Sequence, residues 1–308
     1  MRIRPKVIHY TLCTVIITAF LAGCSQERSP GKISVGAKSA VIMDARDGEM
    51  LFEKNPDKRY PPASTAKVMT AIVAIERMSL SKEIVAGKKE LHVEPTIAGL
   101  KPGIGYSLED LLKAILIKSA NDAAVVIAKA VAGSEKRFAS LMNAKAKELD
   151  MENTYFANAS GLPAGKKDLQ YTSSDDLAKM MRYALRYRII PEFMSMKKTT
   201  IYGSDGKGIY LKTHNKSLFS RAGASWGKTG YTNEARRTFV GVDPSSHPRV
   251  IIAFLKSNTI WSDIATLKKK GLVLYSLKHG NIFSGILRWL VEQRQKGREA
   301  AIVQNFDL

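Results

Sequence analysis

Residues 61–78, Pro-Pro-Ala-Ser-Thr-Ala-Lys-Val-Met-Thr-Ala-Ile-Val-Ala-Ile-Glu-Arg-Met, contain the segment around which this chain is organised. Apolar residues recur at helical spacing after Ser64, which predicts a helix over 64–78. Two prolines cannot extend that helix backwards, so we expect Ser64 at its first turn, near free N–H groups and the positive end of the helix dipole. Lys67 lies one turn later on the same face. The stretch predicts a serine whose hydroxyl a lysine can reach.

Two further short strings complete a pattern. Ser119-Ala120-Asn121 fits S-x-N, and Lys228-Thr229-Gly230 fits K-T-G. With Ser64 to Lys67 as S-x-x-K, they stand in the order found in serine acyl-transfer sites that use a lysine as base. Each string alone carries little information, because these residues are common and also suit helix caps or an exposed strand. All three in this order indicate an enzyme.

The chemistry assigns a role to each catalytic candidate. A serine hydroxyl needs a neighbour that takes its proton, and Lys67 can do so only when it is uncharged. Burial, together with the positive charge of Lys228, can lower the pKa of Lys67 from about 10.4 towards neutrality. Ser119 can relay a proton between either lysine and the leaving amine, and Asn121 can hold the lysine and a substrate amide.

The third string is interpreted as a substrate-binding strand. Lys228 and Thr229 can bind a carboxylate, and Gly230 leaves space where a substrate backbone pairs with the strand. The N–H groups of Tyr231 and Ser64 are expected to form an oxyanion hole, worth about 3 kcal/mol per donor in comparable sites.

The N-terminus has the pattern of a targeting segment. Basic residues at positions 2–6 precede an apolar run over 7–22, and Leu21-Ala22-Gly23-Cys24 resembles the lipobox of bacterial lipoproteins. The resemblance implies a signal peptide over 1–23, acylation of Cys24 and a polar tether over 24–33. An ordinary signal peptide is the alternative. The only other cysteine lies inside the apolar run, so the mature chain has no partner for a disulfide.

Strand patterns at both ends and helix patterns between them predict one domain over 34–280. Asp47-Gly48 joins two apolar runs as a hairpin, and two β-rich runs follow the Lys-Thr-Gly string. We expect an α+β fold, an antiparallel sheet built from both chain ends and flanked by a helical lobe. The helices are expected at 64–78, 108–117, 122–131, 135–149, 174–187 and 263–278. Residues 281–308 are expected to form a C-terminal helical extension that packs on the domain or lies in a membrane interface.

The composition of the chain indicates which kinds of binding partner to expect. The formal charge of +20 favours an anionic neighbour such as a membrane surface or a cell-wall polymer, although a solvated lysine-rich surface is the alternative. Basic residues are not interleaved with aromatic residues as in nucleic-acid-binding elements, so no nucleic acid is expected. The five histidines lie far apart and no Gly-rich phosphate loop occurs, so we expect neither metal nor cofactor.

The run from 33 to 277 resembles the serine-type D-alanyl-D-alanine carboxypeptidases, the peptidase S11-like low-molecular-mass penicillin-binding proteins. The resemblance is carried by the segments 62–67 (PASTAK), 118–124 (KSANDAA), 159–163 (ASGLP), 171–173 (YTS) and 228–232 (KTGYT). It implies a β-lactamase/transpeptidase-like fold and peptidoglycan stem peptides as substrates. Ser64 is expected to form the acyl-enzyme as terminal D-alanine leaves, and β-lactams are expected to acylate the same serine.

Two departures from the family are noted. Many members read Ser-Gly-Asn where this chain has Ala120, a change that we expect the backbone to tolerate. The chain is also expected to lack the extra C-terminal β-domain of one subgroup, so that a lipid on Cys24 replaces its anchor. The predicted location is the bacterial cell envelope, in the periplasm or on the outer face.

Three other functions remain open at this point. A D,D-endopeptidase would cleave peptidoglycan cross-links with the same residues. A class A-like β-lactamase would need a glutamate that activates the deacylating water, and residues 158–163 contain none. A non-enzymatic wall-binding lipoprotein would keep only the scaffold.

Overall fold

The computed structural model describes residues 33–279, apart from positions 94, 164, 166–168, 221–223, 246 and 248. The predicted signal peptide, Cys24 and the C-terminal extension 281–308 lie outside the described residues, so these expectations stay predictions.

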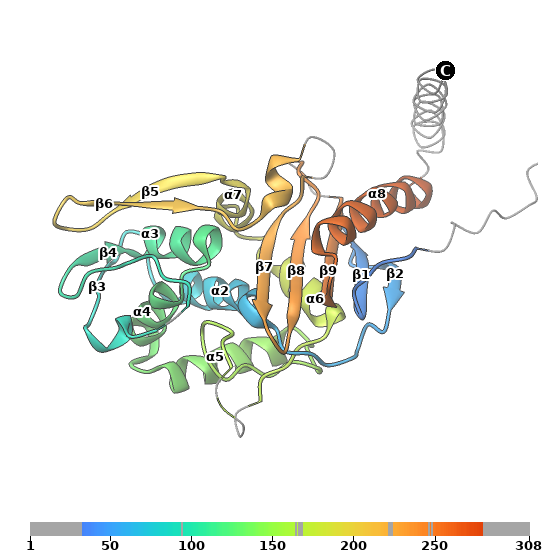
Figure 1. Ribbon diagram of the computed structural model, residues 1–308. Helices are drawn as coiled ribbons and strands as arrows, with labels where there is room; N and C mark the ends of the chain where they lie inside the picture. Colours follow the sequence, from blue (N-terminus) through green and yellow to red (C-terminus); the bar gives the residue numbers. More distant parts are fainter. Residues whose placement is uncertain are drawn as a thin grey trace, which may run out of the picture. The chain divides into compact units, whose positions relative to one another are not determined.

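A five-stranded antiparallel sheet forms the centre of the domain, in the order β2-β1-β9-β8-β7 (Figure 1). Two strands come from the start of the domain and three from its end, which confirms the predicted sheet built from both chain ends. The bounds are β1 Ser39–Asp44, β2 Met50–Lys54, β7 Trp226–Thr232, β8 Arg236–Val242 and β9 Val250–Ser257. Strand β7 is an edge strand of this sheet.

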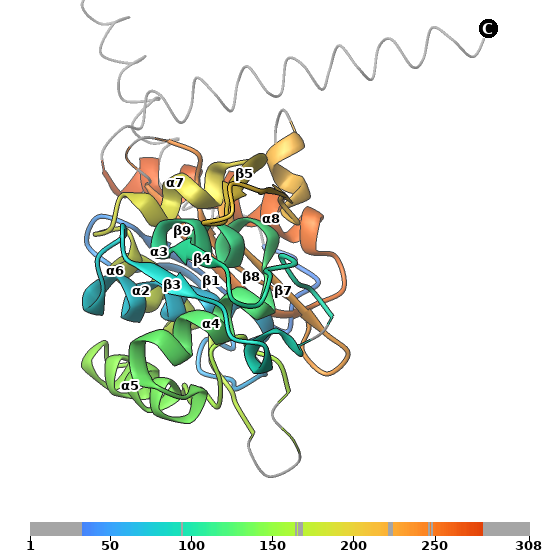
Figure 2. The same ribbon diagram turned by 90° about the vertical axis from the view of Figure 1, so that its left-hand side faces the viewer.

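Helices cover both faces of the sheet. α6 (Ser174–Ala184) and α8 (Ile260–Lys278) pack on β1 and β9 from opposite sides (Figures 1 and 2). All residues of β1 are buried, as expected for a continuous apolar run between two layers. Gly271 lets α8 approach closely, because a Cβ there would lie 2.8 Å from Cγ2 of Ile42.

The other helices form a lobe beside the sheet. α2 (Lys67–Arg77) runs through its centre, and its residues from Lys67 to Ala74 are buried. The lobe also contains α3 (Leu108–Lys113), α4 (Asn121–Ala132), α5 (Glu135–Glu148) and α7 (Ile189–Ser195), and of these α4 and α5 pack against α2. None of the helices among the described residues is long and apolar enough to cross a lipid bilayer.

Short irregular elements lie between these helices. They are the 3-10 turns η1 (Ala63–Ala66), η2 (Lys89–Leu91) and η4 (Lys216–Phe219), the π-helical turn η3 (Ala114–Lys118), and two hairpins: β3 (Glu83–Val85) with β4 (Gly105–Ser107), and β5 (Lys198–Tyr202) with β6 (Gly208–Lys212). The predicted helix over 64–78 thus begins as a 3-10 turn, and the one over 108–117 ends in a π-helical turn.

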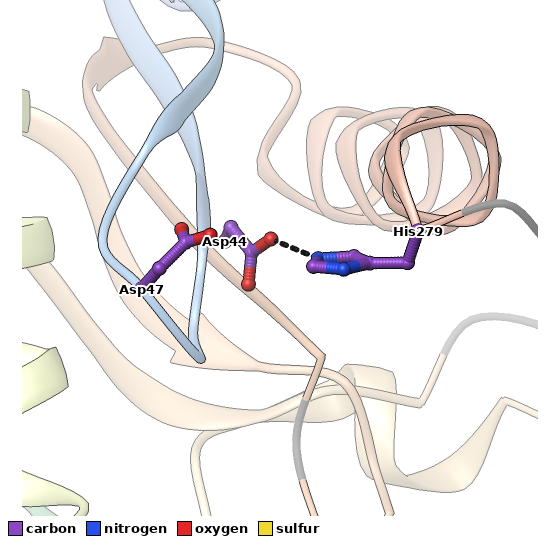
Figure 3. A group of neighbouring side chains, drawn as sticks. All are labelled: Asp44, Asp47 and His279. Carbon is purple, nitrogen blue, oxygen red and sulfur yellow. Dashed lines mark hydrogen bonds and ion pairs between the residues drawn. The ribbon is translucent and has the colours of Figure 1, made fainter.

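The C-terminal end of α8 is tied to the first hairpin by a cluster of charges. Nε2 of His279 lies 2.6 Å from Oδ2 of Asp44 (Figure 3). Nζ of Lys278 lies 3.1 Å from the same oxygen and within 3 Å of carboxylates of Asp47 and Glu49. The carboxylates therefore have cationic partners from the protein itself, and the cluster joins the two ends of the domain.

A second tie at the other end of α8 depends on Asp263, which is only 2% exposed. Its carboxylate accepts hydrogen bonds from the backbone N–H of Gly36 at 2.8 Å, the hydroxyl of Ser257 at 2.6 Å and the hydroxyl of Thr259 at 3.1 Å. One buried carboxylate thus connects the start of the domain, the end of β9 and the start of α8.

We expect Asp263→Ala to lower the free energy of unfolding by about 2–4 kcal/mol, because three donors lose a buried charged acceptor. Urea denaturation followed by circular dichroism measures the change. The exposed Asp57→Ala is the control and should shift the free energy by less than about 0.5 kcal/mol. Equal stability of the two variants would contradict this role of Asp263.

Candidate active site

Ser64 lies on η1, immediately before α2, in a segment held from two sides. The preceding residue, Ala63, has a positive φ of 48°. Gly161, with φ 79°, packs so closely that a Cβ at this position would collide with the carbonyl oxygen of Ala63. On the other side, the hydroxyl of Thr238 on β8 donates to the carbonyl of Pro62 at 3.0 Å. The nucleophile segment is therefore fixed between the helical lobe and the sheet.

Lys67 is fully buried and has three neutral hydrogen-bond partners. Its Nζ donates to Oδ1 of Asn121 at 2.7 Å and to the carbonyl oxygen of Ser160 at 2.6 Å, and it lies 3.0 Å from Oγ of Ser64. Carbonyl oxygens can only accept hydrogen bonds. An uncharged amine has two N–H groups and one lone pair, so both N–H groups are used and the lone pair faces the serine hydroxyl.

The electrostatic surroundings favour this uncharged form. Burial, and then the positive charge of Lys228, hold the pKa of Lys67 well below its ordinary value of 10.5, against a smaller opposite effect of Asp122. Burial lowers the pKa of Lys228 to about 7. Lys67 thus loses its proton far more easily than an exposed lysine, as a base for Ser64 must.

Ser119 and Asn121 lie where η3 ends and α4 begins. The π-helical turn closes on Ser119, whose φ of 65° is left-handed and directs the chain into α4. Its hydroxyl lies 2.8 Å from Nζ of Lys228. The intervening Ala120 has a φ of −61°, so this position does not need glycine.

Lys228, Thr229, Gly230 and Tyr231 lie on the edge strand β7. The Lys228 side chain is 2% exposed and also donates to the carbonyl of Thr229 at 2.7 Å. A Cβ on Gly230 would lie 2.9 Å from the backbone nitrogen of Ser64, so glycine allows β7 to approach the nucleophile. The Tyr231 side chain is 53% exposed. The part of Tyr231 that the sequence predicts to act is its backbone N–H, which belongs to β7.

A cavity of about 650 Å³ opens onto these residues. Ser64, Ser119, Thr229, Gly230 and Tyr231 line it, whereas Lys67 and Lys228 lie beneath its surface. The structure therefore brings all eight catalytic and substrate-binding candidates, from three distant segments, to one place. Cys24, the ninth predicted site residue, lies outside the described residues.

Sequence reasoning gave no site role to two parts of this region. Ser160 contributes its backbone carbonyl to Lys67, and a carbonyl leaves no residue-type signal. The other part is the far wall of the cavity, which includes Tyr210, Lys212, His214 and Lys216 from β6 and the following turn. Exposed lysines are too common to mark a site in a sequence.

Comparisons with known proteins agree with this geometry. A family model described as D-alanyl-D-alanine carboxypeptidase (Peptidase S11) matches residues 25–259. The D-alanyl-D-alanine carboxypeptidase DacF of Bacillus subtilis is 32% identical over 228 residues, covering 72% of this chain and 58% of DacF. DacB2 of Mycobacterium tuberculosis is 32% identical over 244 residues, covering 77% of this chain and 83% of DacB2. This chain therefore spans less than two thirds of DacF and most of DacB2.

A relative named as an endopeptidase and a solved carboxypeptidase structure also match this chain. A D-alanyl-D-alanine endopeptidase of Haemophilus influenzae is 30% identical over 225 residues, covering 72% of this chain and 75% of its own length. Among solved structures, a D-alanyl-D-alanine carboxypeptidase from Mycobacterium tuberculosis H37Rv superposes with a TM-score of 0.72 at 29% identity, covering 78% of this chain and 92% of that chain. With its fold, its three motifs and a family match over most of its length, this chain belongs to the D-alanyl-D-alanine carboxypeptidase family, peptidase S11.

Proposed function

We propose that this chain is a serine D,D-carboxypeptidase, which removes the terminal D-alanine from peptidoglycan stem pentapeptides through an acyl-enzyme on Ser64. The observation that carries the proposal is the coordination of Lys67. Two carbonyl oxygens accept hydrogen bonds from its Nζ, which also lies 3.0 Å from Oγ of Ser64. In the uncharged amine, this leaves the lone pair for the serine hydroxyl. This arrangement is that of a nucleophile with its general base.

Acylation follows from the geometry in two steps. The Ser64 oxygen attacks the carbonyl carbon between the two D-alanines while its proton passes to Nζ of Lys67. The backbone N–H groups of Ser64 and Tyr231 stabilise the oxyanion. When the C–N bond breaks, the leaving amine takes a proton from Ser119, whose hydroxyl lies 2.8 Å from the Lys228 ammonium that resupplies it.

Deacylation uses the same groups with water as the nucleophile. Lys67 returns to its uncharged form by passing its proton towards Ser119 and Lys228, and then accepts a proton from the attacking water. The acyl–oxygen bond of Ser64 breaks as Lys67 passes this proton to Oγ of Ser64, and the shortened peptide leaves. Because Lys67 supplies the base in both half-reactions, no separate glutamate is required, in contrast to a class A-like β-lactamase.

Substrate binding is assigned to the edge strand. The free side of β7 can pair with an extended peptide, with Gly230 allowing the two backbones to approach. Lys228 and Thr229 would hold the terminal carboxylate. β-Lactams, which carry a carboxylate next to a reactive amide, would acylate Ser64 in the same way.

We further propose that the protein is exported and held on a membrane of the cell envelope by a lipid on Cys24, in the periplasm or on the outer face. The lipobox-like residues before Cys24 support this, and the family match begins one position after it. A non-enzymatic wall-binding role would leave the coordinated Lys67 without a purpose.

Replacing the nucleophile tests the reaction. We expect Ser64→Ala to abolish covalent labelling by a fluorescent penicillin and to lower the release of D-alanine from a pentapeptide by at least about 10³-fold. The exposed Ser81→Ala, away from the cavity, should label as the wild type does. Labelling that persists in Ser64→Ala would overturn the assignment.

The pH dependence tests the coupling of the two lysines. Acylation falls as pH drops through the pKa of Lys67, because protonated Lys67 cannot act as a base. Below its own pKa of about 7, Lys228 is positively charged, and this charge lowers the pKa of Lys67. In Lys228→Gln the acidic limb of the acylation rate by penicillin should therefore move to higher pH, at a lower overall rate.

Lys228→Arg is the matched control for this measurement because it keeps the positive charge. Its acidic limb should stay at or below the wild-type position. An acidic limb in Lys228→Gln that is unmoved, or moved to lower pH, would be inconsistent with the proposed coupling.

Anchoring is tested separately from catalysis. Wild-type protein expressed with its full N-terminus in a bacterial host should sediment with membranes, and Cys24→Ala should be released into the soluble fraction. The matched control is Cys13→Ala, which should remain membrane-bound. Membrane association of Cys24→Ala equal to wild type would rule out acylation at Cys24 as the anchor.

A further inference from the structure

The far wall of the catalytic cavity is basic. Lys212 ends β6, and Lys216 begins η4 four residues later; both are exposed and both line the cavity. We call these two residues the basic wall. Lys118 and Arg237 add positive charge elsewhere on the lining, and no aspartate or glutamate lines the cavity among the residues that the structure describes. The cavity is therefore set up to attract an anion.

A buried asparagine fixes the basic wall beside the start of β7. Asn215, 2% exposed, donates to the carbonyl of Ser225 at 2.8 Å and accepts from the backbone N–H and the hydroxyl of Ser217 at 3.1 and 2.6 Å. Ser225 directly precedes β7. The turn between Lys212 and Lys216 is thus fixed beside the start of β7, the end of the strand that leads into Lys228 and Thr229.

This position defines which part of a substrate meets the basic wall. Under the proposed function, Lys228 and Thr229 hold the terminal carboxylate and Ser64 attacks the preceding carbonyl. The leaving residue therefore points towards the start of β7. A D-alanine methyl group is small beside a cavity of about 650 Å³. A longer side chain on the leaving residue would extend towards Lys212 and Lys216.

The field in this part of the cavity is positive even without a charge on the histidine between the two lysines. Partial burial, and then the positive charges of Lys228 and Lys118, lower the pKa of His214. His214 is therefore uncharged at neutral pH, and the charge of this wall comes from the two lysines.

We propose that the leaving-group subsite prefers D-amino acids that bear a second carboxylate, which Lys212 and Lys216 bind. The inference rests on the proposed function and deepens it. A leaving amine that belongs to a larger anionic fragment would use the same subsite. Cleavage of a cross-link releases such a fragment, so the basic wall gives a physical reason to measure endopeptidase activity alongside release of D-alanine.

The test uses peptides that share one acyl part, diacetyl-L-Lys-D-Ala, and end in D-Ala, D-Glu or D-Gln. D-Glu and D-Gln have the same shape and differ in charge. Wild type should show a kcat/KM about three- to tenfold higher for D-Glu than for D-Gln. The ratio should fall towards 1 when the salt concentration is raised from about 0.05 to 0.5 M.

Substitutions of Lys212 and Lys216 test whether these two residues cause the preference for D-Glu. In the double variant Lys212→Gln/Lys216→Gln, the ratio of kcat/KM for D-Glu to kcat/KM for D-Gln should fall to about 1, because the ion pairs that cause the preference are lost. Lys198→Gln is the matched control, because Lys198 is exposed on the same hairpin and pairs with Lys212 across the strands but does not line the cavity. It should keep the wild-type ratio. Labelling of Ser64 by fluorescent penicillin verifies an intact site in each variant.

The outcomes separate the two proposals. Release of D-Ala with no preference for D-Glu over D-Gln, or a preference that survives the double substitution, overturns the inference and leaves the proposed function standing. Failure of wild type to cleave any of the three peptides overturns the proposed function, and the inference with it.

Discussion

The arrangement of the active site depends on one buried amine, Nζ of Lys67. Lys67 lies at the start of the most buried helix, and its three hydrogen-bond partners are neutral groups. A protonated lysine in such surroundings loses its hydration without gaining a carboxylate, so burial favours the uncharged amine. The partners come from η1, from the start of α4 and from the segment around Ser160. Much of the helical lobe can be understood as the scaffold that brings these three segments to one nitrogen.

The backbone is strained close to the place where these three segments meet. Ala63 and Ser119, on either side of the site, both have positive φ values, which cost non-glycine residues roughly 1–3 kcal/mol each. Gly161 has a positive φ as well, and its lack of a side chain allows contact with Ala63. These conformations persist because the surrounding core is packed on all sides, from α2 and α4 to β7 and β8. The site is thus held in its reactive geometry before a substrate binds.

Much of this arrangement could be predicted from the sequence, and the reasons are specific. Long periodic segments such as α5 and α6 were predicted within a few residues, and the apolar runs at both chain ends predicted the sheet. The residue types Ser64, Lys67 and Lys228 predicted the chemistry because few reactions need them together. The hairpin of β5 and β6 was not predicted, since only Ile201 and Leu211 are buried in its short strands. The carbonyl of Ser160 and the basic wall were missed because neither depends on an unusual residue type.

The charge state of Lys67 is the central claim, and NMR can observe it directly. In protein carrying 13C-labelled lysine, the Cε resonance of Lys67, assigned by its loss in Lys67→Arg, should titrate well below the ordinary lysine pKa of about 10.4. Most exposed lysines in the same spectrum should titrate near that ordinary value. A Lys67 resonance that titrates together with those exposed lysines would show a protonated amine at neutral pH, and would contradict the account of Ser64 activation given above.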